Sequence, residues 1–221
     1  MNTSELKKFA QWARRTLIEQ AGARMSSVLE AGSAERREFP TAVSALEREI
    51  RNSSEAQVVE RAAYVWFNRL SALMFMDANG YTAVRAVSPN EGQTRPALLS
   101  DAMAGHIDEA LPQKVRERAL ALLTRSAPSR EPEAEAYRLL LVAVCNQWHD
   151  VMPFMFEKIA DWTELLMPVD LLSSDSILAN MREVMTEDAC QDVEIIGWLY
   201  QFYISEKKDQ VFAGLKKNVK I

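Results

Sequence analysis

Glycine is scarce in this chain, and its positions exclude the common phosphate-binding loops. The 221 residues contain seven glycines, at positions 22, 32, 80, 92, 105, 197 and 214. No Gly-x-Gly pattern and no P-loop can be written with this spacing. Few glycines and few β-branched runs, together with abundant Ala, Leu, Glu, Arg and Met, favour helices over strands. We therefore predict an all-α fold, an irregular bundle of several helices.

Cysteines and long apolar runs are also few. Cys145 and Cys190 are the two cysteines, and no apolar leader segment stands near Met1. This combination is typical of a reducing compartment rather than of secretion, so we predict a cytoplasmic protein. No apolar run approaches the roughly 18 to 20 residues that a membrane-spanning helix requires. We therefore expect no membrane partner.

The familiar catalytic motifs are missing as well. The eight prolines are never adjacent, no serine lies in a Gly-x-Ser-x-Gly turn, and two unlinked cysteines do not make a Cys-His-Asn set. Carboxylates such as Glu183 and Asp192 are numerous, but nothing gives two of them contrasting environments, and we interpret them as solvated surface. The sequence predicts no catalytic residue and no cofactor-binding residue in this chain.

Four side chains carry suitable ligand atoms for zinc: His106, Cys145, His149 and Cys190. Cys145 and His149 are four residues apart, which places them on one face of a helix. The others are scattered, no Cys-x-x-Cys pair is present, and Cys145 ends the apolar run "LLLVAVC". We interpret the cysteines as buried thiols and expect no metal site.

Helical periodicity organises the rest of the chain. Ser54 and Gln57 form a capping-box signature, and the helix that they begin is expected to run from about Glu55 to Asn79 and to end at Gly80. The polar stretch that follows predicts one long loop around residues 81–111, with a short helix after Ser100.

Further helices are expected toward the C-terminus. One begins near Pro112, and a central buried helix contains the apolar run of residues 139–145. A shorter helix is capped by Ser174 or Asp175, and the last one begins near Val193. We divide the chain into a helical domain, residues 1–192, and a helix with a basic connector, residues 193–221.

Net charge is −5, which argues against a protein that coats nucleic acid, so any contact with DNA requires a local basic patch. The first helix is expected to begin after Thr3 or Ser4 and to bury an apolar face. Its opposite face carries Lys7, Lys8, Arg14 and Arg15, which are either DNA or domain contacts or an ordinary solvated face. A second basic group contains Lys207, Lys208, Lys216 and Lys217, with Lys220.

An arginine interrupts the most apolar helix. Asn68 and Arg69 follow Trp66 and Phe67 in a segment whose two faces are both largely apolar. Burying an arginine without a partner costs several kcal/mol or more. We therefore expect Arg69 to meet a carboxylate or to reach solvent at a seam between helices, where it orients the packing rather than a reaction.

Two segments together resemble a known family. "AAYVWFNRLSALMFMDANGY" (62–81), with Trp66, Phe67, Asn68 and Arg69, and "EIIGWLYQFYISEKKDQVFAGLKKNVKI" (194–221), with Trp198, Tyr200 and Tyr203, are similar to the N-terminal region of the PglX family. These proteins are adenine-specific DNA methyltransferases of bacteriophage-exclusion (BREX) defence systems. The opening "MNTSELKKFAQWAR" is similar in style. The two main segments cover about a fifth of the chain.

The resemblance implies a parent protein that transfers a methyl group from S-adenosylmethionine to N6 of adenine. That chemistry needs a glycine-rich loop and an Asn/Asp-Pro-Pro-Tyr/Phe motif for the flipped base, and this chain contains neither. The resemblance therefore implies an N-terminal piece without catalysis of its own. Its implied partners are the methyltransferase domain of the same polypeptide and DNA, with other BREX subunits or phage inhibitors as further possibilities.

Two alternatives stay open on the sequence alone. Instead of a piece of a methyltransferase, the chain could be a stand-alone helical adaptor. It could also be a helical DNA-binding module that uses the basic residues of the first helix and of the C-terminal segment. A reading frame that continues beyond codon 221 into a Pro-Pro motif favours the methyltransferase, whereas a stop codon favours the adaptor.

Overall fold

The computed structural model describes residues 3–153, 156 and 162–205. Within this part of the chain it contains helices and loops, with one isolated bridge between Pro89 and Pro96, and it confirms the predicted all-α class. The helices are α1 (Thr3–Leu29), α2 (Ala34–Glu38), α3 (Pro40–Asn52), α4 (Glu55–Ala78), α5 (Ala97–Met103), α6 (Gln113–Leu123), α7 (Pro132–His149), α8 (Trp162–Leu165), α9 (Ile177–Val184), the 3-10 helix η1 (Ala189–Gln191) and a helix over residues 194–205.

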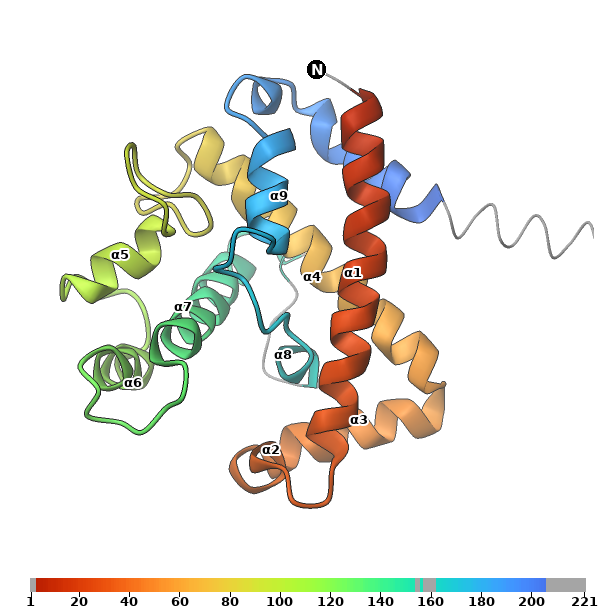
Figure 1. The fold of residues 1–221 in the computed structure, drawn as a ribbon, viewed down its shortest axis with the longest axis vertical. Coiled ribbons are helices and arrows are strands. Elements are labelled where there is room, and N and C mark those ends of the chain that lie inside the picture. The colour runs from red at the N-terminus through yellow and green to blue at the C-terminus, as the bar shows by residue number, and fades with distance from the viewer. Residues whose placement is uncertain (1–2, 154–155, 157–161, 206–221) are drawn as a thin grey trace, which may run out of the picture.

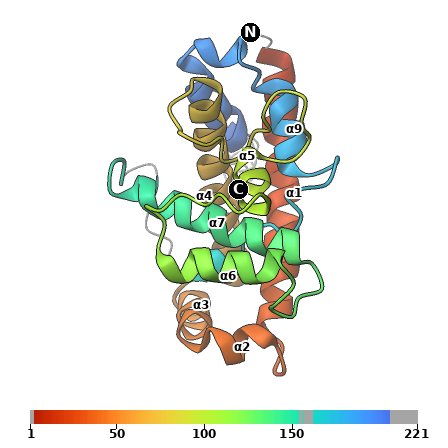
Figure 2. The same cartoon turned by 90° about the vertical axis from the view of Figure 1, so that its left-hand side faces the viewer.

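The long helix α1 organises the bundle. It runs along the length of the molecule, α4 crosses it, and α2 and α3 lie at one end (Figure 1). Helices α6 and α7 pack on each other on one side of the molecule, which faces the viewer in Figure 2. None of the helices in the described ranges is long and apolar enough to cross a membrane.

Two apolar clusters are arranged along α1. The larger contains the first half of α1, most of α4 and the buried faces of α5, α6, α7, α9 and residues 194–205. The smaller contains Ala21, Met25 and Val28 of α1 with buried residues of α3, α8 and the start of α4. One helix therefore links both parts of the core.

The helix α1 buries the face that its periodicity predicts. Leu6, Phe9, Ala10, Ala13 and Leu17 are all buried, because residues three and four apart lie on one side of a helix. At the start of α4, the Ser54 hydroxyl accepts a hydrogen bond from the Gln57 amide at 3.3 Å, as the capping signature predicted. At its end Gly80 has φ +65°, the left-handed conformation expected there.

Two expected helix starts are displaced. The short helix predicted after Ser100 begins at Ala97 instead, directly after Pro96, and it buries Leu98 and Leu99. Neither Ser174 nor Asp175 caps α9. The cap is Ser176, whose hydroxyl accepts from the Ala179 amide at 3.2 Å, because only this serine lies immediately before the first helical residue.

The buried carboxylate of Asp77 fixes the loop that follows α4. Its two oxygens accept hydrogen bonds from the backbone amides of Ala86, Val87 and Ser88 at 2.8–2.9 Å and from the Thr82 hydroxyl at 2.9 Å. Burial raises the pKa of this carboxyl, and the four hydrogen bonds oppose that shift. Because the pKa is raised, the desolvation of the carboxylate outweighs the stabilisation that its four hydrogen bonds provide.

Substituting Asp77→Asn is expected to destabilise the protein, because the new amide nitrogen cannot accept from the donors that one carboxylate oxygen serves. Each buried donor left unpaired costs about 1–3 kcal/mol, so we expect the free energy of unfolding to fall by about 2–4 kcal/mol. Urea denaturation followed by circular dichroism measures this loss. The exposed Asp175→Asn is the matched control, and equal values for the two variants would contradict the anchoring role.

Candidate interaction site at the junction of residues 62–81 and 194–205

The two segments that carry the family resemblance pack against each other. The Phe67 ring of α4 stacks on the Tyr203 ring with centroids 4.4 Å apart. Tyr64 lies at 5.9 Å from Tyr203 and meets Tyr200 edge-on at 6.0 Å. Aromatic pairs at such distances contribute roughly 0.5–1.5 kcal/mol beyond their buried area. We call Tyr64, Phe67, Tyr200 and Tyr203 the aromatic junction.

The helix α1 closes the junction from a third side. Phe9 lies 6.3 Å from the Phe67 ring. Arg14 of α1 forms an ion pair with Glu60 of α4 at 2.5 Å, and Gln11 donates to the Ser205 hydroxyl at 3.5 Å. Polar contacts therefore border an apolar centre and fix how the helices sit on one another.

Tyr203 is placed by its ring rather than by its hydroxyl. The residue is buried, and its hydroxyl has no hydrogen-bond partner among the described atoms. Burial raises the pKa of the phenol, and the neighbouring Arg14 lowers it to a smaller extent. The phenol is therefore neutral over the physiological range and acts as an apolar ring in the packing.

Trp66 and Arg69 occupy the opposite side of α4. The Trp66 indole donates to the Thr163 carbonyl at 2.9 Å, which ties α8 to α4. The Arg69 guanidinium lies over the Trp66 ring, 5.2 Å from its centroid, and is only 1% exposed. Arg69 therefore does not reach solvent, which was one of the two outcomes expected for it. Its predicted position between packed elements is confirmed. Asn68 is half-buried beside it.

Three further aromatic residues of the helix over residues 194–205 flank its buried side. Trp198 and Phe202 stack with centroids 5.7 Å apart, and both are only partly buried. Tyr200 is 43% exposed. The inward side, with Ile195, Leu199 and Tyr203, belongs to the main core. Partly exposed aromatic side chains next to a rigid junction suit contact with another protein surface.

The predicted basic stripe of α1 loses one member. Lys7, Lys8 and Arg15 are exposed. The prediction that Arg14 shares their solvent-facing side is wrong, because Arg14 is 8% exposed and pairs with Glu60. Arg14 stands four residues after Ala10 and three before Leu17, which places it at the edge of the buried face. The lysines at 207, 208, 216 and 217 lie outside the described residues.

The candidate zinc ligands are not brought together. Within the described ranges no group of three or more metal-ligating side chains occurs. Burial raises the pKa of the Cys145 thiol to about 12 and that of the Cys190 thiol to about 11. His149 interacts through Nδ1 with the Phe156 carbonyl at 2.7 Å, so that ring nitrogen serves the chain's own backbone.

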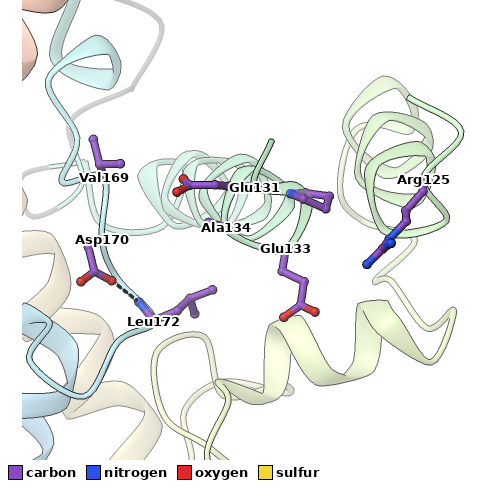
Figure 3. Close-up of a pocket in the computed structure, with 8 residues that line it drawn as sticks. Arg125, Glu131, Glu133, Ala134, Val169, Asp170 and Leu172 are labelled. Atoms are coloured by element: carbon purple, nitrogen blue, oxygen red, sulfur yellow. Dashed lines mark hydrogen bonds between the residues drawn. The ribbon is translucent and has the colours of Figure 1, made fainter. Parts of the chain in front are cut away.

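A pocket beside the start of α7 is lined by charged side chains that do not converge on one point. It is lined by Arg125 after α6, by Glu131 and Glu133 at α7, and by Asp170 before α9. Figure 3 shows Glu131 and Glu133 pointing to different sides, while Asp170 accepts from the Leu172 amide at 3.2 Å. Hydrogen bonds from Ser173 and Leu172 lower the pKa of Asp170 despite its partial burial. This carboxylate serves its own turn.

Sequence reasoning missed the partners that fix these helices. Glu60, Asp77 and Thr163 received no role, although each holds a neighbouring element through an ion pair or a hydrogen bond. Asp77 carried one detectable signal, a carboxylate three residues before the helix-ending Gly80 in an otherwise apolar run. The Thr163 carbonyl carried none, because any residue supplies a backbone oxygen.

Replacing the hydroxyl and the ring of Tyr203 separately is expected to distinguish their contributions. Tyr203→Phe removes a buried hydroxyl that lacks a hydrogen bond, so the free energy of unfolding is expected to stay within about 0.5 kcal/mol or to rise slightly. Tyr203→Ala removes the ring that stacks on Phe67 and is expected to cost about 3–5 kcal/mol. Chemical denaturation measures both, and a large loss in Tyr203→Phe would show that the hydroxyl matters.

The ion pair between α1 and α4 is tested by comparing two cations of one helix. Arg14→Gln leaves Glu60 partly buried without its cation and is expected to cost about 1–3 kcal/mol. Lys7→Gln changes an exposed cation and is expected to change stability by less than about 0.5 kcal/mol. Thermal and urea unfolding at low ionic strength give the comparison. Similar small effects would place Arg14 with the solvated residues.

Two curated relatives match the chain. An adenine-specific methyltransferase BrxX from Escherichia coli O9:H4 (strain HS) is 34% identical over an aligned length of 242 residues. The alignment covers 99% of this chain and 20% of that protein. An adenine-specific methyltransferase PglX from Lacticaseibacillus casei (strain Zhang) is 30% identical over 168 residues, 72% of this chain and 14% of that protein. No protein-family model matches. The chain spans about a fifth of the length of the first relative, and it is homologous to part of the PglX and BrxX adenine-specific methyltransferases, which confirms the resemblance of its two quoted segments.

Proposed function

We propose that this chain is the helical N-terminal domain of a BREX-type, site-specific DNA (adenine-N6) methyltransferase used in anti-phage defence. It holds the methyltransferase domain, DNA or partner subunits in place and performs no catalysis itself. The observation that carries the proposal is the match over 99% of the chain to a fifth of an adenine-specific methyltransferase. A match of this extent leaves the larger part of such a protein to supply the chemistry.

The composition of this chain agrees with a scaffold role without catalysis. No two prolines are adjacent, and the glycine spacing allows no cofactor loop, so the base-binding motif and the S-adenosylmethionine loop belong elsewhere in the parent protein. S-adenosylmethionine would supply the methyl group there. The buried carboxylate of Asp77 and the carboxylate of Asp170 serve internal contacts.

The aromatic junction gives the proposed scaffold a rigid docking element. The inward side of residues 194–205 is fixed by Phe67 stacking on Tyr203, while Trp198, Tyr200 and Phe202 remain accessible to different degrees. In the proposed division, residues 1–192 form the helical domain and residues 193–221 lead toward the methyltransferase domain. A helix whose buried side is anchored in the core, with accessible aromatic residues beside that side, is suited to hold a partner in a fixed position.

Contact with DNA is proposed through two groups of cations. Lys7, Lys8 and Arg15 lie on the outer side of α1, and the lysines at 207, 208, 216 and 217 are proposed to add to them. Such cations bind phosphate oxygens without reading sequence. They would therefore set the position of the duplex, and base recognition would belong to other parts of the enzyme.

The proposal predicts a chain that is silent alone and active in combination. Isothermal titration of the purified 221-residue protein with S-adenosylmethionine is expected to show no binding, and incubation with duplex DNA is expected to give no N6-methyladenine. The reading frame beyond codon 221 is expected to encode a domain with an Asn/Asp-Pro-Pro-Tyr/Phe motif. Co-expressed with that domain, the chain is expected to co-purify with it and to be required for methylation.

The test is a substitution at a partly exposed aromatic residue outside the aromatic junction, with a control on α6. Trp198→Ser is expected to weaken co-purification while leaving the chain folded, whereas Lys114→Ser on an exposed position of α6 is expected to leave it unchanged. Tight cofactor binding by the isolated chain, or full methylation without it, would overturn the proposal.

A further inference from the structure

The helix over residues 194–205 carries an exposed strip along one side. Val193, directly before the helix, and Gly197, Tyr200 and Ile204 follow one another at spacings of four, three and four residues, which places them on one face. Val193 is 72% exposed and Tyr200 is 43% exposed. Gly197 is exposed as well, and Ile204 is half-buried. We call these four residues the exposed strip, and Figure 1 shows this helix, in blue, at the edge of the bundle.

The exposed strip is separate from the other two sides of this helix. Ile195 and Leu199 belong to the main core. Because each residue of a helix turns by about 100°, Trp198 and Phe202 point about 100° or more away from the centre of the strip. A partner that covers the strip therefore leaves Trp198 accessible.

The two segments that meet beside the strip contain almost no charge. Residues 195–205 include no Asp, Glu, Lys or Arg. Residues 62–76 of α4 include one charged residue, Arg69, and it is only 1% exposed. A strongly basic or acidic partner would find no opposite charge to pair with on the strip. Burial of apolar surface is the attraction that this surface offers.

Tyr200 and Gly197 form a projection and a gap on the strip. The Tyr200 ring is supported from behind, because the Tyr64 ring of α4 meets it edge-on at 6.0 Å. At Gly197 an added Cβ would meet no atom within 4 Å among the described residues. Glycine in the interior of an exposed helix is less favourable than alanine, and no close packing inside the described chain requires it here. The bare backbone at Gly197 is thus open to a side chain from outside.

The projection and the gap make the strip complementary to a second copy of itself. Two such helices can lie antiparallel across a two-fold axis that passes midway between Gly197 and Tyr200. Tyr200 of each copy then faces Gly197 of the other, and Val193 faces Ile204. An isologous dimer requires a surface that matches itself in this way. The absence of a side chain at Gly197 lets the two helices approach closely.

Electrostatics favour the same surface and the same orientation. Each chain has a net charge of −5, so two copies repel each other where charged surfaces meet, and the strip avoids this repulsion. Asp192 and Glu194 are exposed at the start of the helix. In a parallel pair these carboxylates would lie side by side. The antiparallel pair separates them and places each set beside the uncharged residues 203–205 of the other copy.

We infer that the exposed strip is a dimer interface, in which the helix over residues 194–205 pairs antiparallel with that of a second copy. Tyr200 of each copy fills the gap at Gly197 of the other, and Val193 packs on Ile204. The interface does not use Trp198. It therefore stands whether or not this chain docks a methyltransferase domain.

Analytical ultracentrifugation of the intact 221-residue chain at micromolar concentrations tests the inference. The chain is expected to show a reversible equilibrium between monomer and dimer. Gly197→Lys is expected to weaken dimerisation at least about tenfold, because the interface would then bury an ammonium group without a partner. Ser44→Lys adds the same charge at an exposed position of α3, and its dimerisation is expected to stay within about twofold of the unsubstituted chain.

Gly197→Ala is expected to have opposite effects on folding and on association. Alanine favours a helix over glycine, so the melting temperature of the dilute monomer is expected to rise. The added methyl group occupies the gap that Tyr200 of the other copy fills, so dimerisation is expected to weaken. Thermal unfolding followed by circular dichroism and ultracentrifugation measure the two effects separately.

Cross-linking locates the interface. Cys145 and Cys190 are buried, so a cysteine introduced at position 197 is the more accessible thiol. A short bismaleimide is expected to join two Gly197→Cys chains to each other. Glu117→Cys, at an exposed position of α6, is the control and is expected to stay single under the same conditions.

The contrary results are equally specific. A chain that stays monomeric at millimolar concentration, equal losses in Gly197→Lys and Ser44→Lys, or cross-linking at position 117 but not at 197 would overturn the inference. A monomer in which Gly197→Lys abolishes co-purification with the methyltransferase domain would assign the strip to that domain instead. Trp198→Ser is expected to leave the dimer intact, so failure of the docking proposed above is measured separately. Circular dichroism verifies the fold of every variant.

Discussion

The packing of α4 against α1 and against residues 194–205 is the constraint on which the molecule depends. Phe67 stands at its centre, because it touches Phe9 on one side and stacks on Tyr203 on the other. The same helix carries Trp66 toward α8 and Asp77 toward the loop after it. Side chains of α4 therefore position α1, α8, the loop after α4 and residues 194–205.

Polar groups inside the bundle hold elements together at a cost that their hydrogen bonds offset. Asp77 satisfies three backbone amides that no strand or helix serves, and Arg14 spans α1 and α4. Apolar residues in these places would bury comparable area, but they would not select one loop conformation or one helix register. Internal polarity of this kind suits a part whose task is to present surfaces in a fixed arrangement.

Much of the fold was accessible from the sequence because it depends on local patterns. The buried face of α1, the Ser54 cap and the left-handed Gly80 each follow from spacing within a few residues. Arg14 and Asp77 were not recognised, since their partners are decided by which helices meet in space. The aromatic junction was predictable in part. Its two segments were singled out by resemblance, but their contact, with Tyr64 and Phe67 against Tyr203, is seen only in the folded structure.

Both cysteine thiols of the folded chain have low reactivity. With the pKa of Cys145 near 12 and that of Cys190 near 11, neither thiol supplies an appreciable amount of thiolate at neutral pH, and both are enclosed by the core. Peroxides and alkylating agents attack the thiolate. Oxidative stress would thus leave both cysteine thiols untouched for as long as the helices stay packed, and a modified cysteine would mark a molecule that had already opened.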